Sequence, residues 1–263
     1  MSVVLAPAKL TLSLRITGVR DDGYHLIDAE MTTLDLHDRL EIEHATPSTL
    51  EFTGPFAQGL VADDRNLVTR ALRFVGRSAS VVLEKNIPHG GGLGGGSADA
   101  AAVLRWAGVD IDRKTVATHL GADVPFCLAG GRARVRGIGE IIEPIEQRPG
   151  VVTLIVPPFS VSTPAVYRAW DELGGPRSDG PNDLEPAALV VEPRLADWRE
   201  AIHRATGVRP VLAGSGATWF VNGDHEQILR TAWHEGQQHE TGRNRLDELE
   251  GISKAHVIVA RHV

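Results

Sequence analysis

A glycine-rich stretch is the part of this sequence best suited to chemistry. Six of the seven residues from Gly90 to Gly96 are glycine, and an alanine-rich run at 98–106 follows at once. Because glycine has no Cβ, such a loop can adopt positive φ and turn successive backbone N–H groups into one concavity. A helix N-terminus directly after it favours an anion, most often phosphate. We therefore predict a phosphate-binding loop rather than a flexible linker, because linkers mix glycine with polar residues.

Three common nucleotide-binding motifs do not fit this loop. Gly90-x-Gly92-x-x-Gly95 formally matches the dinucleotide fingerprint, but residues 85–89 separate the glycines from the apolar strand at 81–83. No clear strand ending in an acidic residue follows at the required distance. A Walker A loop is excluded because no Gly-Lys-[Ser/Thr] follows, and the His-Arg-Asp and Asp-Phe-Gly triplets of protein kinases are missing. We therefore expect a nucleotide-binding loop of another kind.

Two charged residues could act beside the loop. Residues 9–16 alternate apolar and polar, which predicts a half-buried strand whose polar face begins at Lys9. Asp123 follows an expected helix at 114–120, and Pro125 bars simple helical continuation, so Asp123 is expected on a stiff, irregular segment. The pattern alone predicts a solvated strand residue for Lys9 and a turn cap for Asp123.

An aromatic residue and a histidine, Tyr24-His25, follow a turn at 17–23. Their spacing favours a ligand clamp and a wedge on the core equally.

Strands and helices alternate along the rest of the chain, which indicates α+β or α/β layering, with a domain boundary near 146–150. We expect strands at 27–36, 40–44, 49–53, 79–84, 133–136, 141–145, 151–156 and 256–260 and flanking 214–216, and helices near 67–75, 97–106, 163–170, 194–205 and 224–235, with a loose segment at 174–182.

Composition narrows the class of protein. The 263 residues are 42% hydrophobic and 23% charged, which is ordinary for a globular protein with one large or two modest domains. A net charge of −7 argues against a nucleic-acid-binding surface. The single cysteine, Cys127, allows no internal disulfide and lies in an apolar run, so it is expected to pack rather than react, as suits a reducing cytoplasm. Lys9 and Arg15 interrupt the N-terminal apolar region, which predicts neither a signal peptide nor a membrane span.

An ordered set of short motifs resembles one family over nearly the whole chain. The motifs are Pro7-Ala-Lys9, Asp22-Gly-Tyr-His25, Ile87-Pro-x-Gly-Gly-Gly-Leu-Gly-Gly-Gly-Ser97, Gly121-Ala-Asp-Val-Pro125, Asn182-Asp-Leu-Glu185 and Ala213-Gly-Ser-Gly216. The glycine loop resembles the GHMP kinase superfamily. The Asp-Gly-Tyr-His and Gly-Ala-Asp-Val-Pro motifs make the chain similar, within it, to the 4-diphosphocytidyl-2-C-methyl-D-erythritol kinases.

The resemblance implies a fold and a reaction. The fold would be α+β with two domains: an N-terminal domain of a sheet with helices at 1–148 and a ferredoxin-like C-terminal domain at 149–263, with the site between them. The reaction would transfer the γ-phosphoryl group of ATP, with Mg²⁺, to the 2-hydroxyl of a cytidine diphosphate-alcohol, a step of the non-mevalonate isoprenoid pathway. The resemblance further implies a cytoplasmic enzyme, a monomer or weak homodimer, without a nucleic-acid or membrane partner.

The resemblance also assigns roles to single residues. Lys9 and Asp123 fall on the catalytic pair of the family, with Asp123 accepting the hydroxyl proton and Lys9 keeping that carboxylate ionised; this assignment replaces both pattern-based predictions. The implied nucleotide-binding residues are Pro88, Gly90, Gly91, Gly92, Leu93, Gly94, Gly95, Gly96, Ser97 and, near the adenine, Asn66. The implied substrate-binding residues are Thr11, Tyr24, His25, Tyr167, Gly214, Ser215 and Gly216, the two tyrosine rings enclosing cytosine and His25 bonding it.

The chain departs from the family pattern in places. Thr11 replaces the usual asparagine, Ala98 replaces the second serine after the loop, and 174–182 is short. A loop glycine stands where other superfamily members have a Mg²⁺-binding serine, so no protein metal ligand is assigned. Two alternatives therefore stay open: a GHMP kinase acting on another small alcohol, and a catalytically silent nucleotide-binding module.

Overall fold

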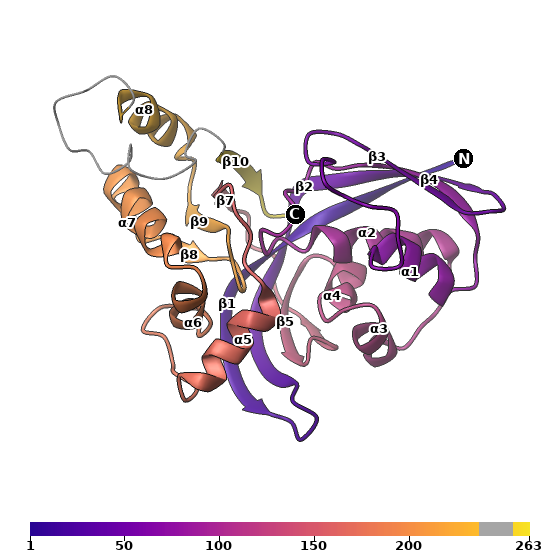
Figure 1. The fold of residues 1–263 in the computed structure, drawn as a ribbon, viewed down its shortest axis with the longest axis horizontal. Coiled ribbons are helices and arrows are strands. Elements are labelled where there is room, and N and C mark those ends of the chain that lie inside the picture. Colours follow the sequence, from indigo (N-terminus) through magenta and orange to yellow (C-terminus); the bar gives the residue numbers. More distant parts are fainter. Residues whose placement is uncertain (237–254) are drawn as a thin grey trace.

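The computed structural model describes residues 1–236 and 255–263, and these form two β-sheets with helices packed against them. The two sheets meet along the middle of the molecule, and a long hairpin of two strands runs through that junction (Figure 1). The predicted α+β class is confirmed. None of the helices in the described part of the chain combines the length and hydropathy that a bilayer crossing requires.

The first sheet is organised around a long hairpin. Strands β1 (Ser2–Val19) and β2 (His25–His44) pair antiparallel along almost their whole length. The other edge of β2 pairs with β4 (Ala79–Glu84) at one end and β5 (Arg132–Gly137) at the other. Strand β3 (Thr49–Thr53) lies parallel to β4, and β6 (Ile141–Pro144) pairs with β5.

The predicted strand positions in this sheet are correct, and so are the bounds of β3 and β4, but the two hairpin strands are longer than predicted. Residues 27–36 and 40–44 belong to one strand rather than two, and 9–16 is the middle of an 18-residue strand. The β1–β2 register shifts between Pro7 and Lys9 and again between Thr11 and Ser13. Such irregularities bend a strand and re-aim its side chains, and they recur next to active sites. Here they flank Lys9 and Thr11.

Four helices lie between β3 and β5 in the chain, one of them before β4 and three after it. They are α1 (Leu67–Phe74), α2 (Gly95–Ala107), α3 (Arg113–His119) and α4 (Val124–Ala129). The alanine-rich α2 is buried along 98–104, where it packs with α1, α4 and the apolar side chains of β2 and β4. Small side chains let the helix approach the sheet closely, which places the glycine loop at its N-terminus directly against β1.

Asp123 lies in the turn between α3 and α4, as expected, but helix α4 itself was not predicted. Helix α4 begins immediately after Asp123, which is its N-cap residue, and Pro125 lies in the first helical turn. Proline is tolerated there because the first N–H groups of a helix have no acceptor within the helix. Gly121 ends the preceding helix with φ near +148°, as the sequence predicted for a residue just beyond that helix.

The second sheet has the strand order β10-β7-β9-β8. Its strands are β7 (Val151–Val156), β8 (Val211–Leu212), β9 (Trp219–Asn222) and β10 (His256–Arg261), and its helices are α5 (Thr163–Glu172), α6 (Glu185–Val191), α7 (Arg194–Thr206) and α8 (Glu226–Gly236). The chain passes through strand, helices, two strands, helix and strand, which is the ferredoxin-like arrangement. Helix α6 lies just beyond the segment that the sequence predicted as loose, and it was not predicted.

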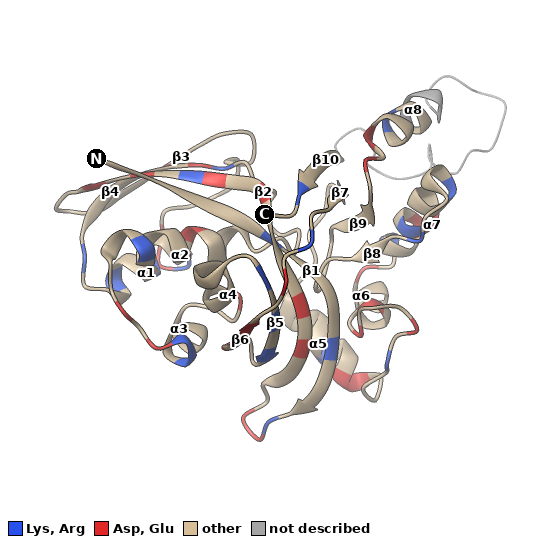
Figure 2. Cartoon of the chain, turned by 180° about the vertical axis from the view of Figure 1, so that it is seen from behind, with Lys and Arg blue, Asp and Glu red and all other residues tan. Residues whose placement is uncertain are grey.

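Charged side chains on the first sheet pair across neighbouring strands. Arg134 and Arg132 of β5 form ion pairs with Asp28 and Glu30 of β2, both at 2.5 Å. Figure 2 shows acidic positions of the hairpin, in red, beside basic positions of β5, in blue. Opposite charges on adjacent strands support the pairing register, although exposed pairs of this kind contribute little to stability. Apolar side chains alternate with these acidic residues along β2 and point to the opposite face of the sheet, into the core. They are Ile27, Ala29 and Met31.

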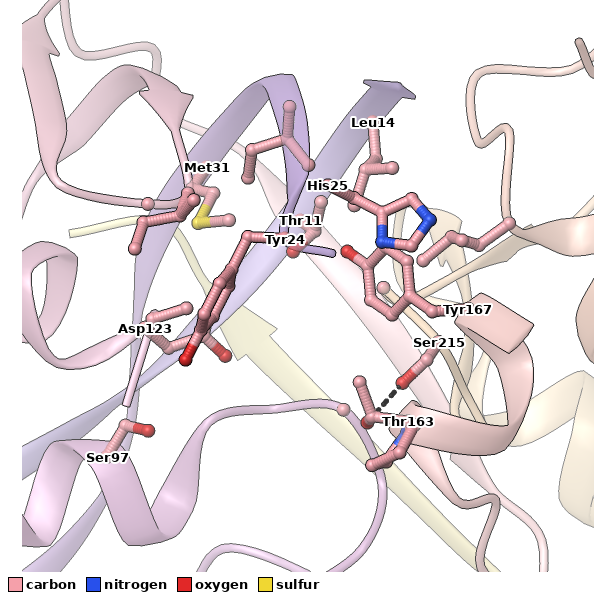
Figure 3. Close-up of a pocket in the computed structure, with 18 of the residues that line it drawn as sticks. Thr11, Leu14, Tyr24, His25, Met31, Ser97, Asp123, Thr163, Tyr167 and Ser215 are labelled. Carbon is pink, nitrogen blue, oxygen red and sulfur yellow. Dashed lines mark hydrogen bonds between the residues drawn. The ribbon is translucent and has the colours of Figure 1, made fainter. Parts of the chain in front are cut away.

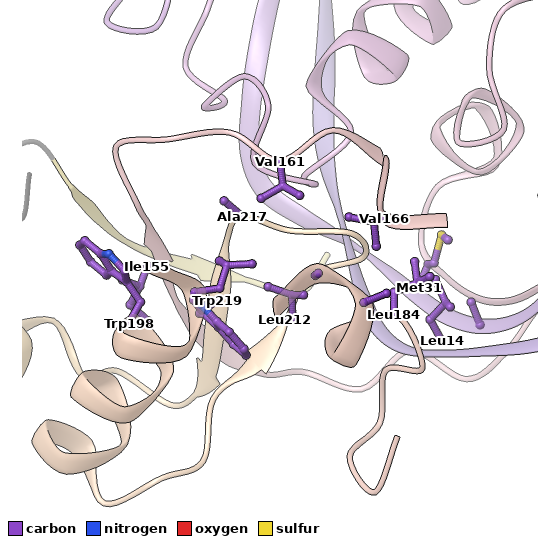
Figure 4. Close-up of a cluster of buried hydrophobic side chains, with 14 of the residues drawn as sticks. Leu14, Met31, Ile155, Val161, Val166, Leu184, Trp198, Leu212, Ala217 and Trp219 are labelled. Carbon is purple, nitrogen blue, oxygen red and sulfur yellow. The ribbon is translucent and has the colours of Figure 1, made fainter. Parts of the chain in front are cut away.

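That core is shared by both sheets. Leu14 and Met31 of the hairpin lie in the same cluster of buried side chains as Ile155, Leu212 and Trp219 of the second sheet (Figure 4). The cluster also includes apolar side chains of α5, α6 and α7. Because one continuous cluster of buried side chains joins the two sheets, the position of β1 relative to the second half of the chain is fixed by packing.

A buried aspartate reinforces this junction. Asp183 is fully buried. Its carboxylate accepts hydrogen bonds from the backbone N–H groups of Ile16 and Ser178, both at 3.1 Å, and forms an ion pair with Arg15 at 2.6 Å. Next to it, Asn182 donates to the backbone oxygens of Leu212 and Gly214. These two residues tie β1 to the second sheet.

We expect Asp183→Ala to lower the free energy of unfolding by about 2–5 kcal/mol, because it leaves two buried N–H groups and an arginine without their acceptor. The measurement is urea unfolding at pH 7. Asp179→Ala, at an exposed aspartate in the same segment, is the matched control and should change stability by less than about 0.5 kcal/mol. Equal effects in the two variants would show that the Asp183 contacts do not hold the junction.

Candidate active site

A cavity of about 600 Å³ opens where the two sheets meet, beside the glycine loop and α5. Its walls come from β1, the turn into β2, the loop before α4, the N-terminal part of α5 and the turn before β9 (Figure 3). The predicted site residues that line it are Lys9, Thr11, Tyr24, His25, Gly92, Ser97, Asp123, Tyr167, Gly214 and Ser215. Residues from five distant parts of the sequence are thus brought together.

Lys9 lies at the centre of this cavity wall. Its backbone N–H donates to the Leu93 oxygen at 3.0 Å, which ties β1 to the glycine loop. Its ammonium is 3.2 Å from the Asp123 carboxylate and donates to the Thr11 hydroxyl at 3.2 Å, while the side chain is only 6% exposed. A buried charge requires a partner, and these two oxygens provide it. The strand pattern alone, which predicted a solvated lysine, is therefore wrong.

The Asp123 carboxylate makes no capping hydrogen bond to the helix that follows it, although Asp123 is the N-cap residue of α4. The side chain is 33% exposed and reaches Lys9 across the cavity wall. The pattern-based expectation of a turn cap is therefore wrong, and the carboxylate is available to a ligand.

The glycine loop is held by contacts that exclude side chains. Gly90, Gly92 and Gly94 have φ of about +72°, +77° and +70°. A Cβ on Gly92 would lie 2.3 Å from the Ala213 oxygen, and one on Gly94 would lie 2.7 Å from the Lys9 side chain. The loop therefore touches the second sheet on one side and Lys9 on the other. Gly94 is also the N-cap of α2, so the free N–H groups of that helix begin here.

Several predicted nucleotide-binding residues do not line this cavity. They are Pro88, Gly90, Gly91, Leu93, Gly95, Gly96 and Asn66. Pro88 and Leu93 are buried beneath the loop. The Asn66 side chain caps α1 by accepting the N–H of Val68 at 2.9 Å, so its carboxamide oxygen is already used.

The predicted turn 214–216 meets the cavity only in part. Gly214 and Ser215 line it, and the Ser215 hydroxyl is 2.7 Å from that of Thr163 at the start of α5. Gly216 does not line it, and its N–H donates to the Ala213 oxygen at 3.1 Å. The Gly216 N–H therefore closes its own turn, and the structure does not bring this predicted substrate-binding residue to the cavity.

The other end of the cavity is aromatic. Figure 3 shows Tyr24, which follows the β1–β2 turn, and Tyr167, which belongs to α5, on opposite sides of the open space. Tyr24 is 46% exposed, and burial raises the pKa of the Tyr167 hydroxyl, so that group stays protonated at neutral pH. The His25 ring lies 4.7 Å from that of Tyr167. The geometry favours the clamp over the core wedge, two roles that spacing had left equal.

A buried ionic cluster under the loop was not predicted. Lys85, at the end of β4, bonds the carboxylates of Asp38 and Asp99, and all three side chains are buried. Asp38 also accepts the N–H groups of Asn86 and Ile87, at the start of the loop. The Asp99 carboxylate has one oxygen without a hydrogen-bond partner. A lysine at a strand end, in a chain with only four lysines, was the signal that could have indicated this cluster.

Burial and the negative charge of Asp38 raise the pKa of Asp99 from 3.8 to about 7, although Lys85 acts in the opposite direction. Burial would lower the pKa of Lys85, but Asp99 and Asp38 together raise it. The cluster therefore carries a carboxyl group whose charge changes near neutral pH, one turn into the helix that follows the loop.

The contact between Gly94 and Lys9 can be tested by adding one methyl group. We expect Gly94→Ala to lower the free energy of unfolding by about 1–3 kcal/mol, because alanine disfavours positive φ and its Cβ meets Lys9. Gly96→Ala is the control, since its Cβ would lie 3.5 Å from the nearest atom and φ is not positive there. Urea unfolding of both variants is the measurement, and a loss of stability in Gly96→Ala as large as in Gly94→Ala would contradict the account.

The titration of Asp99 predicts a pH-dependent difference in stability. The folded chain binds a proton at Asp99 that the unfolded chain releases, so this residue makes the free energy of unfolding fall as pH rises from about 4 to about 7. Asp99→Asn cannot titrate and should gain stability relative to the wild type across that window. Urea unfolding at intervals from pH 4.5 to 8 measures the difference, with Asp21→Asn, at an exposed aspartate, as control. A difference independent of pH would contradict the raised pKa.

Comparisons with known proteins show which family this chain is similar to. A family model described as the GHMP kinases N terminal domain matches residues 66–131. A protein of Paracoccus denitrificans named 4-diphosphocytidyl-2-C-methyl-D-erythritol kinase is 44% identical over 234 residues, which are 82% of this chain and 84% of that protein. One of the same name from Cereibacter sphaeroides is 39% identical over 88% of this chain and 93% of its own. A crystal structure of 4-(cytidine 5′-diphospho)-2C-methyl-D-erythritol kinase covers all of both chains at 32% identity, with a TM-score of 0.70.

Proposed function

The chain belongs to the family of 4-diphosphocytidyl-2-C-methyl-D-erythritol kinases, and we propose that it uses Lys9 and Asp123 to transfer the γ-phosphoryl group of ATP to the 2-hydroxyl of that substrate. The observation that carries the proposal is the ion pair of these two residues, 3.2 Å apart. It lies between the glycine loop on one side and the aromatic end of the cavity on the other.

Asp123 acts as the base. Its carboxylate accepts the proton of the 2-hydroxyl as the oxygen of that hydroxyl forms its bond to the γ-phosphorus and the bond from the γ-phosphorus to the bridging oxygen of ADP breaks. Lys9 holds the carboxylate in place and donates a hydrogen bond to the attacking oxygen. Phosphoryl transfer needs little covalent help, so most of the acceleration comes from positioning and charge stabilisation.

The glycine loop and the start of α2 bind the phosphates of ATP. The N–H groups of Gly94 to Ser97 have no acceptor within the helix, and Gly92 and Ser97 line the cavity. Within the described residues no group of three or more His, Cys, Asp or Glu side chains is placed to hold a metal ion. Mg²⁺ would bind mainly through the phosphates, with the Ser97 hydroxyl as an oxygen donor from the cavity wall. It would neutralise charge on the transferring phosphoryl group.

The aromatic end binds the cytidine. Tyr24 and Tyr167 enclose the base, His25 bonds it, and Gly214 and Ser215 lie along the path of the diphosphate. Thr11 has a different task from the asparagine that usually stands there: its hydroxyl accepts a hydrogen bond from Lys9 at 3.2 Å. A side chain that orients the lysine supports the same reaction with a changed contact to the substrate.

Asp123→Asn tests the proposed base. It should lower kcat by about 10²- to 10⁴-fold, because a single base contributes on this scale. The affinity for ATP should stay within about threefold, because the asparagine leaves the glycine loop intact. Release of ADP in the presence of the substrate measures kcat, and calorimetry measures the affinity.

Asp110→Asn, at an exposed aspartate between α2 and α3, is the control and should keep full activity. An unchanged kcat in Asp123→Asn would remove Asp123 from the mechanism. A parallel loss of ATP affinity and of stability would assign it a structural role instead.

A further inference from the structure

Helix α5 presents three neighbouring side chains to His25. Tyr167, Trp170 and Asp171 lie at helical spacing on one face of the helix. The Asp171 carboxylate is 2.8 Å from Nε2 of His25. The rings of Tyr167 and Trp170 pack against the imidazole, with centroids 4.7 and 5.5 Å away.

These contacts leave the imidazole little freedom. The His25 side chain is 10% exposed, whereas Asp171 is 48% exposed. Trp170 is itself fixed, because its indole N–H donates to the Pro176 oxygen at 2.9 Å. Gly175, with φ of +71°, lies so close that a Cβ there would be 2.9 Å from the Trp170 ring. The orientation of the His25 ring is therefore set by packing, and Asp171 determines which ring nitrogen donates a hydrogen bond.

An ionised carboxylate only accepts hydrogen bonds, so the neutral imidazole beside it carries its proton on Nε2. Nδ1 then has a lone pair and accepts. Among the described residues no hydrogen bond reaches Nδ1, and His25 lines the cavity. The histidine thus offers the ligand an acceptor rather than a donor.

We propose that Asp171 is a positioning residue that holds His25 in this tautomer and so makes the base subsite select cytosine over uracil. Cytosine carries an amino group at position 4, which can donate to Nδ1. Uracil carries a carbonyl oxygen there, which would face a second acceptor and lose the bond. The inference rests on the proposed function, because it assumes that the pyrimidine base binds beside His25.

Binding of CDP and UDP tests the selection without any turnover. Calorimetry on the full-length protein, with a non-hydrolysable ATP analogue at saturation to occupy the phosphate loop, gives both dissociation constants. The wild type should bind CDP more tightly than UDP. Asp171→Ala frees both tautomers and should reduce that ratio by about tenfold or more. Asp171→Glu keeps a carboxylate and should keep the ratio within about threefold, and Glu172→Gln, one residue further on, should leave it unchanged.

The tautomer can be observed directly. ¹⁵N NMR of the imidazole in the ligand-free protein should show His25 protonated on Nε2 in the wild type and a mixture of tautomers in Asp171→Ala. A Nδ1-protonated wild type, equal affinity of the wild type for CDP and UDP, or an unchanged ratio in Asp171→Ala would each overturn the inference. Turnover of the diphosphocytidyl substrate by the wild type tests the proposed function separately, since neither nucleotide binding nor the tautomer depends on Lys9 or Asp123.

Discussion

A buried lysine charge is the constraint on which the site depends. Lys9 lies inside the molecule with almost no contact with water, so its ammonium needs an anionic partner, and its position on β1 decides where that partner must be. Asp123, at the start of α4, supplies the negative charge. Thr11, on the same strand as Lys9, accepts a hydrogen bond from the ammonium. The backbone of Lys9 bonds the glycine loop, so one residue ties the phosphate-binding loop to the carboxylate that would take the substrate proton.

The loop itself is supported from three sides. Its glycines touch Lys9 on one side and the Ala213 carbonyl of the second half of the chain on another, at distances that admit no Cβ. From below, Lys85, Asp38 and Asp99 connect the strand before the loop to the helix after it. Asp183 and the shared core fix the position of one sheet relative to the other, and the contact between the glycine loop and the Ala213 carbonyl depends on that position. The active site is thus a property of the junction rather than of either half.

Local patterns predicted much of this, and their failures have physical reasons. The glycine run, the alternation from 9 to 16 and the Pro–helix start at 163–164 each reflect one local conformation, so they could be predicted. The sequence pattern misplaced the Lys9 and Asp123 side chains because their burial comes from contacts between distant segments, and only family motifs indicated the pair. Asp183, Asp99 and Asp171 gave no local signal, since each binds a partner that is 14 or more residues away in the sequence. Helix α4 was not predicted because proline breaks the interior of a helix, whereas Pro125 lies in the first turn, where a helix tolerates it.

The most direct test of the account is to identify the phosphorylated atom. The wild-type protein would be incubated with ATP, Mg²⁺ and 4-diphosphocytidyl-2-C-methylerythritol, and the products followed by ³¹P NMR. We expect one new phosphomonoester resonance that appears in step with ADP, while the substrate diphosphate stays unchanged. This resonance should be coupled to no carbon-bound proton, because the 2-carbon carries none. ADP without a new monoester, or a monoester on another hydroxyl, would contradict the placement of the 2-hydroxyl between Asp123 and the glycine loop.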